Sequence, residues 1–250
     1  MLELQSQSPE WRPGATVESP AIVLSSLRYQ ETGKIVHLLT PDQGRITVYA
    51  PGAVNSRKRF GASLEPMCFI QAQLRLARDH GTGHSMTSIL KADLRDSFLH
   101  LRTHSALLES GAFAVKFINE FLPEGQSEPV VFRAVGRFLR DSVKLSDPGR
   151  QALWARFAFW NWMSRHFGFG DLKEAWGSHR TGELSSFMLG AWNQLMEQTE
   201  PDFGRFFDVL VREKPPHLTR TDEGSLYGKW TEISGFHWPD FERWLQCSSF

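Results

Sequence analysis

The strongest concentration of positive charge in the sequence is Arg57-Lys58-Arg59. It follows Pro51–Ser56, a run rich in small and turn-forming residues, which predicts an exposed loop. Three adjacent cations on a loop can contact phosphate groups at low steric cost, and neutralised phosphates release counterions. The sequence therefore predicts a polyanion-binding loop here. An ordinary solvated loop is the alternative interpretation.

Polar and apolar residues alternate from Arg45 to Ala50, which predicts a half-buried strand with Arg45, Thr47 and Tyr49 on one face. An unpaired base can stack on an aromatic ring, so Tyr49 fits single-strand binding. Packing of Tyr49 within the fold is an equally good interpretation. The candidate nucleic-acid-binding residues are Arg28, Lys34, Arg45, Tyr49, Arg57, Lys58, Arg59, Arg75 and Arg78.

A second cationic pattern has helical spacing. Arg133, Arg137, Arg140 and Lys144 follow one another at intervals of four, three and four residues. On a helix these intervals form one stripe. The stripe fits either a solvated surface or a ridge for an acidic partner such as phosphate or a carboxylate-rich peptide. Together with Arg156, these residues are the candidate partner-binding set.

No pattern indicates covalent chemistry. Gly81-Thr82-Gly83-His84 and Gly168-Phe169-Gly170 lack the Lys-Ser/Thr pair of a phosphate-binding loop. The nine His residues show no metal-ligand spacing, and no Ser, His and Asp can be assigned to a triad. Cys68 and Cys247 are far apart and are predicted to be apolar fillers. We therefore predict that the protein is not an enzyme and uses no cofactor and no metal.

The composition is that of a globular chain. The 250 residues are 41% hydrophobic and 22% charged, which excludes wholesale disorder. There are 28 basic and 28 acidic residues, with a small basic excess in the first 80, so polyanion binding is expected there. The sequence has no apolar run long enough for a membrane span and no secretory signal pattern. We expect a cytoplasmic protein without membrane contact.

The first part of the chain reads as strands. Alternating or continuous apolar runs separated by turn residues predict strands at 21–24, 35–40, 45–50, 68–77 and 86–90. Five short strands without long helices favour a small closed barrel, and the five-stranded OB-fold is the leading candidate. Residues 1–18 are rich in Pro and Ser and are expected to form a flexible extension.

From Ala92 onward, apolar residues recur at steps of three and four, which indicates amphipathic helices. Helices are predicted between 92 and 121 and over 130–143, 152–167, 184–198 and 203–212, whereas the polar segment 217–235 gives no clear prediction. Eight of the nine Trp residues lie after residue 150. The predicted fold class is α+β, with an OB-fold domain over 19–91 and an all-α helical domain over 92–250.

Several segments carry a more specific signal through their order and spacing. They are Ala21–Ser25, Glu31–Thr40, Gly44–Ala50, Gly52-Ala53 with Arg57-Lys58, Gly61–Met67, and Leu90–Leu94 with Phe98 and Leu101-Arg102. This series resembles the bacterial recombination mediator family RecO, and Gly168-Phe169-Gly170 looks like the family's Gly-aromatic-Gly segment. The match fades beyond about Leu172, apart from 184–195.

The resemblance implies an N-terminal OB-fold on a helical domain, binding of single- and double-stranded DNA, and annealing of complementary strands. It also implies contacts with RecR and with the acidic, Phe-ended tail of single-strand-binding protein, which together load RecA onto coated DNA. That tail is expected near Arg133, Arg137 or Arg156. Some members carry a four-Cys zinc site after the Gly-aromatic-Gly segment. Asp171–Phe187 contains no Cys, so no zinc is expected.

A second hypothesis is a protein-interaction adaptor whose barrel binds a peptide instead of DNA. The two hypotheses differ in which cations carry affinity. A mediator depends on the Arg57-Lys58-Arg59 loop, and an adaptor depends on Arg133 and Arg137.

Overall fold

The computed structural model describes residues 11–56, 58–77, 86–171, 186–215, 218 and 220–234. Arg57, Arg78 and Cys247 lie outside these ranges, as do most of the predicted N-terminal extension and the segment searched for zinc ligands. The chain divides into two compact units. One consists of Met1–Leu99 with Val115–Gly136, and the other consists of His100–Ala114 with Arg137–Phe250.

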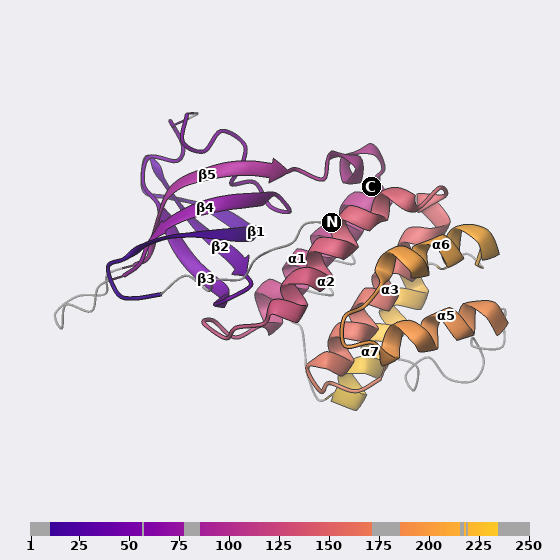
Figure 1. Cartoon of the computed structure of the whole chain (residues 1–250). Coiled ribbons are helices and arrows are strands. Elements are labelled where there is room, and N and C mark those ends of the chain that lie inside the picture. The colour runs from indigo at the N-terminus through magenta and orange to yellow at the C-terminus, as the bar shows by residue number, and fades with distance from the viewer. Residues whose placement is uncertain are drawn as a thin grey trace. The chain divides into compact units, whose positions relative to one another are not determined.

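A five-stranded sheet closes into a barrel in the first unit (Figure 1). Its strands are β1 (Thr16–Tyr29), β2 (Gly33–Thr40), β3 (Gly44–Ala50), β4 (Phe69–Arg75) and β5 (Ser88–Asp96). They are hydrogen-bonded in the order β1-β2-β3-β5-β4, and β4 pairs with β1. The β3–β5 pair is parallel and the others are antiparallel. The prediction of an OB-fold followed by helices is confirmed.

β1 closes the barrel because it is long enough to pair with two strands. Its first half, from Thr16 to Ile22, pairs with β4, and the second half, from Ile22 to Tyr29, pairs with β2. The register shifts between Val23 and Ser25, and such an irregularity bends and twists a strand. The bend lets one continuous strand lie against both neighbours.

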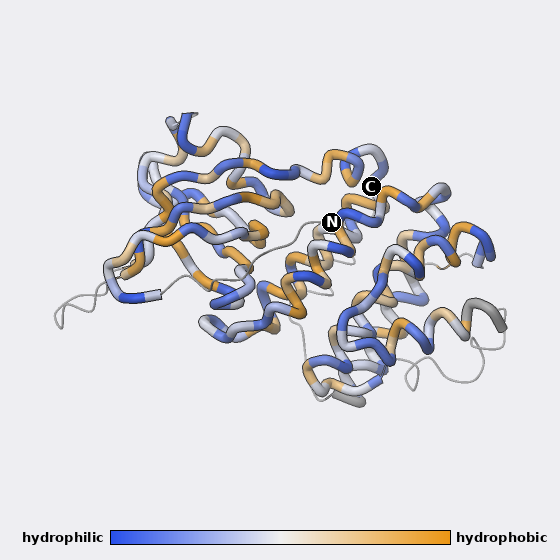
Figure 2. Tube along the Cα trace, viewed as in Figure 1, coloured by the Kyte–Doolittle hydropathy of each residue, from blue (hydrophilic) through white to orange (hydrophobic). Residues whose placement is uncertain are grey.

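The barrel core follows from the alternation along each strand. Val36, Leu38, Val48, Ile70 and Leu74 are fully buried, and burial of each such side chain contributes about 1.5–3 kcal/mol. Figure 2 shows hydrophobic and hydrophilic residues alternating along the strands. Phe60 and Leu64 from the β3–β4 connection complete the core.

The observed elements differ from the sequence-based predictions at both ends of the barrel. Apolar spacing predicts a helix from Ala92, but β5 continues to Asp96, which pairs with Phe69 of β4. The backbone groups of β4 are available as partners over this length, and satisfying them outweighs the local spacing. Residues 16–18, expected in the extension, belong to β1, and Trp11 packs against the barrel core.

The connection between α1 (Ser105–Phe121) and α2 (Pro129–Asp141) is bonded to β3. Arg45 Nε donates to the Leu122 carbonyl at 2.8 Å, and the Arg45 carbonyl accepts from Gly125 N at 2.8 Å. The Glu124 carboxylate accepts from Thr47 N at 2.8 Å. Residues between the helices therefore fix one end of β3.

The second unit is helical. It contains α3 (Pro148–His166), α5 (Ser186–Glu197), α6 (Phe203–Glu213) and α7 (Arg220–Ser234), together with the first part of α1 and the end of α2. Two short 3-10 helices, η1 (Leu99–Thr103) and η2 (Ser142–Lys144), precede α1 and follow α2. The helices predicted over 130–143, 152–167, 184–198 and 203–212 are confirmed, with small shifts at their ends. No helix in the described ranges is long and apolar enough to cross a membrane.

α3 is buried continuously from Gln151 to Ser164. Asp147 caps its first turn by accepting from Arg150 N, and Pro148 follows in the first helical position, where a missing N–H costs nothing. Trp160 contacts Phe113 at 5.7 Å and Trp230 at 5.5 Å between ring centroids. The high Trp content of this helix therefore reflects a position enclosed by aromatic side chains.

The turn between β2 and β3 gives a direct test of how the α1–α2 connection is held. Gly44 has φ +58°, and a Cβ atom there would overlap the Gln126 backbone carbonyl. We expect Gly44→Ala to destabilise the protein by about 2–3 kcal/mol, because strained backbone and a steric clash add. The measurement is the free energy of unfolding in urea. Gly125→Ala is the matched control: its φ is +78°, but nothing lies within 4 Å of the added atom, so only the backbone cost of about 1 kcal/mol applies. Equal losses for the two variants would contradict this account.

Candidate nucleic-acid interface

The outward-facing residues of the barrel form a row that can be followed through the strand registers. Leu27 of β1 is opposite Ile35 of β2, which is opposite Tyr49 of β3. Tyr49 is next to Ser88 of β5, and Ser88 is opposite Arg75 of β4. Since neighbouring strands are about 4.8 Å apart, Arg75 is about 10 Å from Tyr49 across the sheet. An aromatic and a cation therefore share one row on the outer surface.

Tyr29 and Tyr49 form an aromatic pair on this surface. Their ring centroids are 6.0 Å apart and the rings are nearly perpendicular, at 81°. Tyr29 is 48% exposed and Leu27 is 61% exposed. The Tyr49 ring lies over Gly33, where an added Cβ atom would be 2.5 Å from Tyr49 Cε2. We call Leu27, Tyr29, Ile35 and Tyr49 the tyrosine platform.

Lys58 and Arg59, the described part of the basic loop, are both exposed. Arg59 donates to the Pro51 carbonyl at 2.8 Å and to Ser56 Oγ at 3.1 Å, and its guanidinium lies 5.0 Å from the centre of the Phe60 ring. These bonds hold the guanidinium near the end of β3. Neither residue has a carboxylate partner within the ranges that the structure describes.

Arg28 and Lys34 occupy directly paired positions on β1 and β2. Like charges in such positions repel each other. Lys34 is compensated by Glu65, whose carboxylate is 3.2 Å from Nζ. Arg28 is exposed and donates to the Glu31 carbonyl at 3.0 Å, so among the described residues its charge has no carboxylate opposite it.

Arg75 and Arg45, the remaining described cations of the predicted DNA-binding set, also differ in whether they have a partner. Arg75 is exposed at the end of β4 and has no ion pair with any described residue. Arg45 is half-buried, and its side chain is bonded to the α1–α2 connection. Among the predicted DNA-binding residues that the structure describes, four are exposed cations without a carboxylate partner in the described part of the barrel, and they are Arg28, Lys58, Arg59 and Arg75.

The predicted cationic stripe on α2 is largely neutralised within the second unit. Arg137 contacts Glu200 at 3.3 Å, and Arg140 contacts the neighbouring Asp141 at 3.2 Å. Lys144 contacts Asp208 at 2.8 Å and donates to the Gly204 carbonyl at 3.1 Å. The contacts of Arg137 and Lys144 tie the end of α2 and η2 to the connection before α6 and to α6 itself. Arg133 is half-buried and belongs to the first unit.

Arg156 lies inside the second unit, with 3% of its surface exposed. Its Nε is 3.1 Å from the carboxylate of Glu223, which is fully buried, and its Nη1 is 3.9 Å from that of Glu109. The guanidinium also lies 5.9 Å from the centre of the Phe113 ring. These contacts join α1, α3 and α7, so the side chain holds three helices together.

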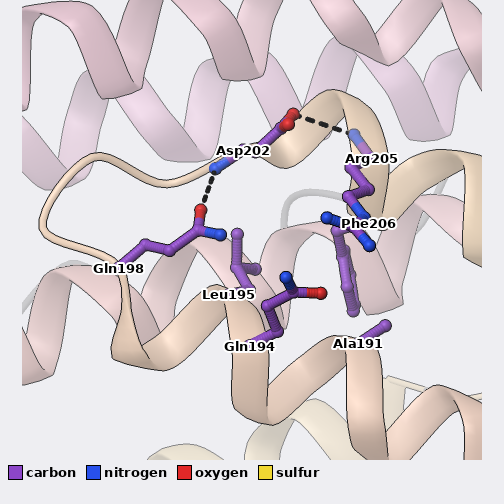
Figure 3. A pocket seen from close by; sticks show the side chains of 7 residues that line it. All are labelled: Ala191, Gln194, Leu195, Gln198, Asp202, Arg205 and Phe206. Carbon is purple, nitrogen blue, oxygen red and sulfur yellow. Dashed lines mark hydrogen bonds between the residues drawn. The ribbon is translucent and has the colours of Figure 1, made fainter.

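A small pocket lies between α5 and α6 (Figure 3). Leu195 and Phe206 are its buried apolar residues, and the exposed Arg205 lies at its edge. Asp202 caps α6 by accepting from Arg205 N at 2.9 Å. The Arg205 guanidinium has no ion pair within the described ranges. The pocket therefore combines an apolar floor with an unneutralised cation.

Sequence reasoning missed Tyr29, Leu27 and Arg205. The strand predicted at 21–24 ended before Leu27, although Leu27 and Tyr29 alternate with the polar Ser26 and Arg28. That alternation is the signal that could have found the platform. No feature of the sequence singles out Arg205. Whether a cation has a carboxylate partner depends on tertiary contacts, which the sequence pattern does not show.

The structure gives no sign of a metal centre in the residues that it describes. No group of three His, Cys, Asp or Glu side chains there could hold an ion. Cys68 is buried in the barrel core, as predicted for an apolar filler.

Comparisons with known proteins agree with this architecture. Residues 15–98, which contain the whole barrel, match the family model described as "Recombination protein O N terminal". The chain is 30% identical over 123 residues to the "DNA repair protein RecO" of Geobacter sulfurreducens, covering 49% of this chain and 48% of that protein. It is 31% identical over 144 residues to the protein of the same name from Syntrophobacter fumaroxidans, covering 58% and 55%. The chain spans about half the length of the curated relatives it matches.

The buried ion pair of the second unit can be tested by unfolding. Arg156→Met leaves Glu223 buried without its cation, and we expect a loss of about 3–5 kcal/mol in the free energy of unfolding. Arg156→Met with Glu223→Gln removes both charges, so the double variant should lose less than the single one. Trp fluorescence in urea measures this, since eight of nine Trp lie after residue 150. Arg150→Met, which removes an exposed pair with Asp147, is the control and should cost less than about 1 kcal/mol. A double variant less stable than the single variant would contradict the role of the pair.

Proposed function

We propose that this chain is a DNA repair and recombination mediator of the RecO family that binds single- and double-stranded DNA through its barrel. The observation that carries the proposal is the set of exposed cations Arg28, Lys58, Arg59 and Arg75 on a barrel that matches the N-terminal model of recombination protein O. Lys34, Arg45 and Tyr49 stay in the proposed DNA-binding set, as do Arg57 and Arg78 beyond the described residues.

The proposed action needs no bond to be made or broken. Phosphate contacts hold a strand without reading its sequence, so they leave base edges available for pairing. A protein that binds two complementary strands in this way raises their local concentration and promotes annealing. With RecR, the same binding helps to load RecA onto DNA coated by single-strand-binding protein. We place this activity in the cytoplasm, at the nucleoid.

We further propose that the pocket between α5 and α6 binds the acidic, Phe-ended tail of single-strand-binding protein. The contacts predicted from the sequence are Arg133, Arg137, Arg140, Lys144 and Arg156, and they stay in the proposed set. Arg137, Arg140, Lys144 and Arg156 each already meet a carboxylate, however, and therefore gain less from an acidic tail. Arg205 beside Leu195 and Phe206 offers what such a tail needs, which is a cation for a carboxylate and an apolar floor for a ring.

The DNA-binding proposal is tested by the salt dependence of single-strand affinity. We expect Lys58→Ala, Arg59→Ala and Arg75→Ala together to lower the affinity and to reduce the slope of log affinity against log salt by about 2, since each phosphate contact contributes about 0.7. Annealing of complementary oligonucleotides coated by single-strand-binding protein should slow in parallel.

Lys91→Ala is the control for this triple variant, because the Lys91 ammonium is 2.6 Å from Asp93 and already neutralised. An unchanged slope for the triple variant would remove these residues from the DNA contact. If DNA affinity is negligible at physiological salt and peptide affinity is high, the adaptor hypothesis replaces the mediator.

The tail-binding proposal is tested with a synthetic peptide of the acidic tail. Arg205→Ala should weaken binding about tenfold, the value of one charge-assisted hydrogen bond of roughly 1.5 kcal/mol. Arg140→Ala, which removes a cation paired with Asp141, should change it less than about twofold. Isothermal titration calorimetry measures both. A larger loss for Arg140→Ala than for Arg205→Ala would move the site to the α2 stripe.

A further inference from the structure

We propose that the tyrosine platform binds unpaired bases and gives the barrel a preference for single strands over duplex DNA. This inference rests on the proposed DNA binding, and it adds a feature that cation contacts alone do not supply. Cations attract the backbone of either form, whereas a ring face can stack only on a base whose own face is open.

The platform is an apolar surface facing solvent. Leu27 is 61% exposed and Tyr29 is 48% exposed, and the registers place Leu27, Ile35 and Tyr49 side by side on three strands. Scattered single apolar residues on a surface need no explanation, but a contiguous group of them marks a binding site.

The aromatic pair is already held in one arrangement. The Tyr49 ring lies over Gly33, and the Tyr29 ring meets it at 81° with centroids 6.0 Å apart. Both residues come from strands of the closed barrel, not from loops. A base that stacks here therefore meets rings that are already ordered, and a preordered surface lowers the entropic cost of binding.

The charge beside the platform favours one kind of ligand. Arg75 lies about 10 Å from Tyr49 along the same outer row. It is exposed and has no carboxylate partner in the described part of the barrel. Aromatic rings beside an unneutralised cation fit a chain that alternates flat bases with phosphates.

The row also indicates a direction for the strand. When a base stacks on Tyr49, one of its two flanking phosphates can extend across β5 toward Arg75 on β4. We therefore expect the bound strand to cross the strands of the barrel instead of running along them. In a duplex each base is stacked on both sides and paired, so it cannot reach the platform without being unstacked, which costs a few kcal/mol.

The test compares a single-stranded oligonucleotide with a blunt duplex of the same length, using the full chain. We expect Tyr29→Leu and Tyr49→Leu together to lower single-strand affinity by about five- to a hundredfold, the range measured for loss of base stacking. Duplex affinity should change less than about twofold. Tyr29→Phe with Tyr49→Phe keeps both ring faces and should restore single-strand binding.

Leu94→Ala is the matched control. Leu94 is another exposed apolar side chain of the barrel, at 47%, but it lies outside the platform, and its loss should leave both affinities unchanged. Equal losses for single strand and duplex in the Leu variants would overturn the proposal, as would no loss at all. If those variants weaken only peptide binding, the occupant is a peptide and the proposal is also wrong.

A second measurement avoids substitutions and any loss of folding that Tyr49→Leu causes. Photocrosslinking of the unaltered protein to a single strand containing iodouracil should attach the base to Tyr29 or Tyr49, as identified by mass spectrometry. Adducts confined to other residues overturn the inference. The salt-slope result for Lys58, Arg59 and Arg75 is independent of these readouts, so a failed platform can be told apart from a failed DNA-binding function.

Discussion

β1 has to pair with β4 over its first half and with β2 over its second half, and the surface chemistry of the barrel depends on this double pairing. Because the registers are fixed by closure, side chains distant in sequence are brought into one outer row. Leu27 and Arg75 belong to the same ring of neighbours only because Ile35, Tyr49 and Ser88 lie between them on successive strands. A shift of one residue in any register would turn these side chains toward the core.

The chain has no net charge, so its capacity to bind a polyanion depends on where the charges are compensated. In the second unit the cations of the α2 stripe meet carboxylates from the α5–α6 connection and from α6, and Arg156 is buried beside Glu223. In the barrel, Lys58 and Arg75 meet none among the described residues. A cation that already has a carboxylate partner contributes little binding free energy on contact with a phosphate, because the new contact replaces an existing one. The zero net charge therefore combines cations that are paired with carboxylates in the helical unit with cations that have no carboxylate partner in the described part of the barrel.

The family match and the tyrosine platform bear on different levels of the proposed function. The match over residues 15–98 covers the barrel and supports the proposal of a role in DNA repair. It does not bear on whether the barrel prefers single-stranded to duplex DNA. The pair of Tyr29 and Tyr49 provides a physical basis for the proposed preference, because stacking on a base requires an open face and a phosphate contact does not.

The fold class and most of the elements follow from local features of the amino-acid sequence. Strand alternation, turn residues and helical spacing are local properties, so they located five strands and the major helices, and the ordered motifs pointed to the family. The partner of each cation depends instead on how the elements pack together. Arg45 and Lys34 read as the same kind of residue as Arg75, yet one binds the Leu122 carbonyl, one meets Glu65, and Arg75 faces solvent. Those outcomes depend on partners 77 and 31 residues away along the chain for Arg45 and Lys34. Local periodicity carries no information about such partners, because they lie in the α1–α2 and β3–β4 connections and meet the strands only when these connections pack against the barrel.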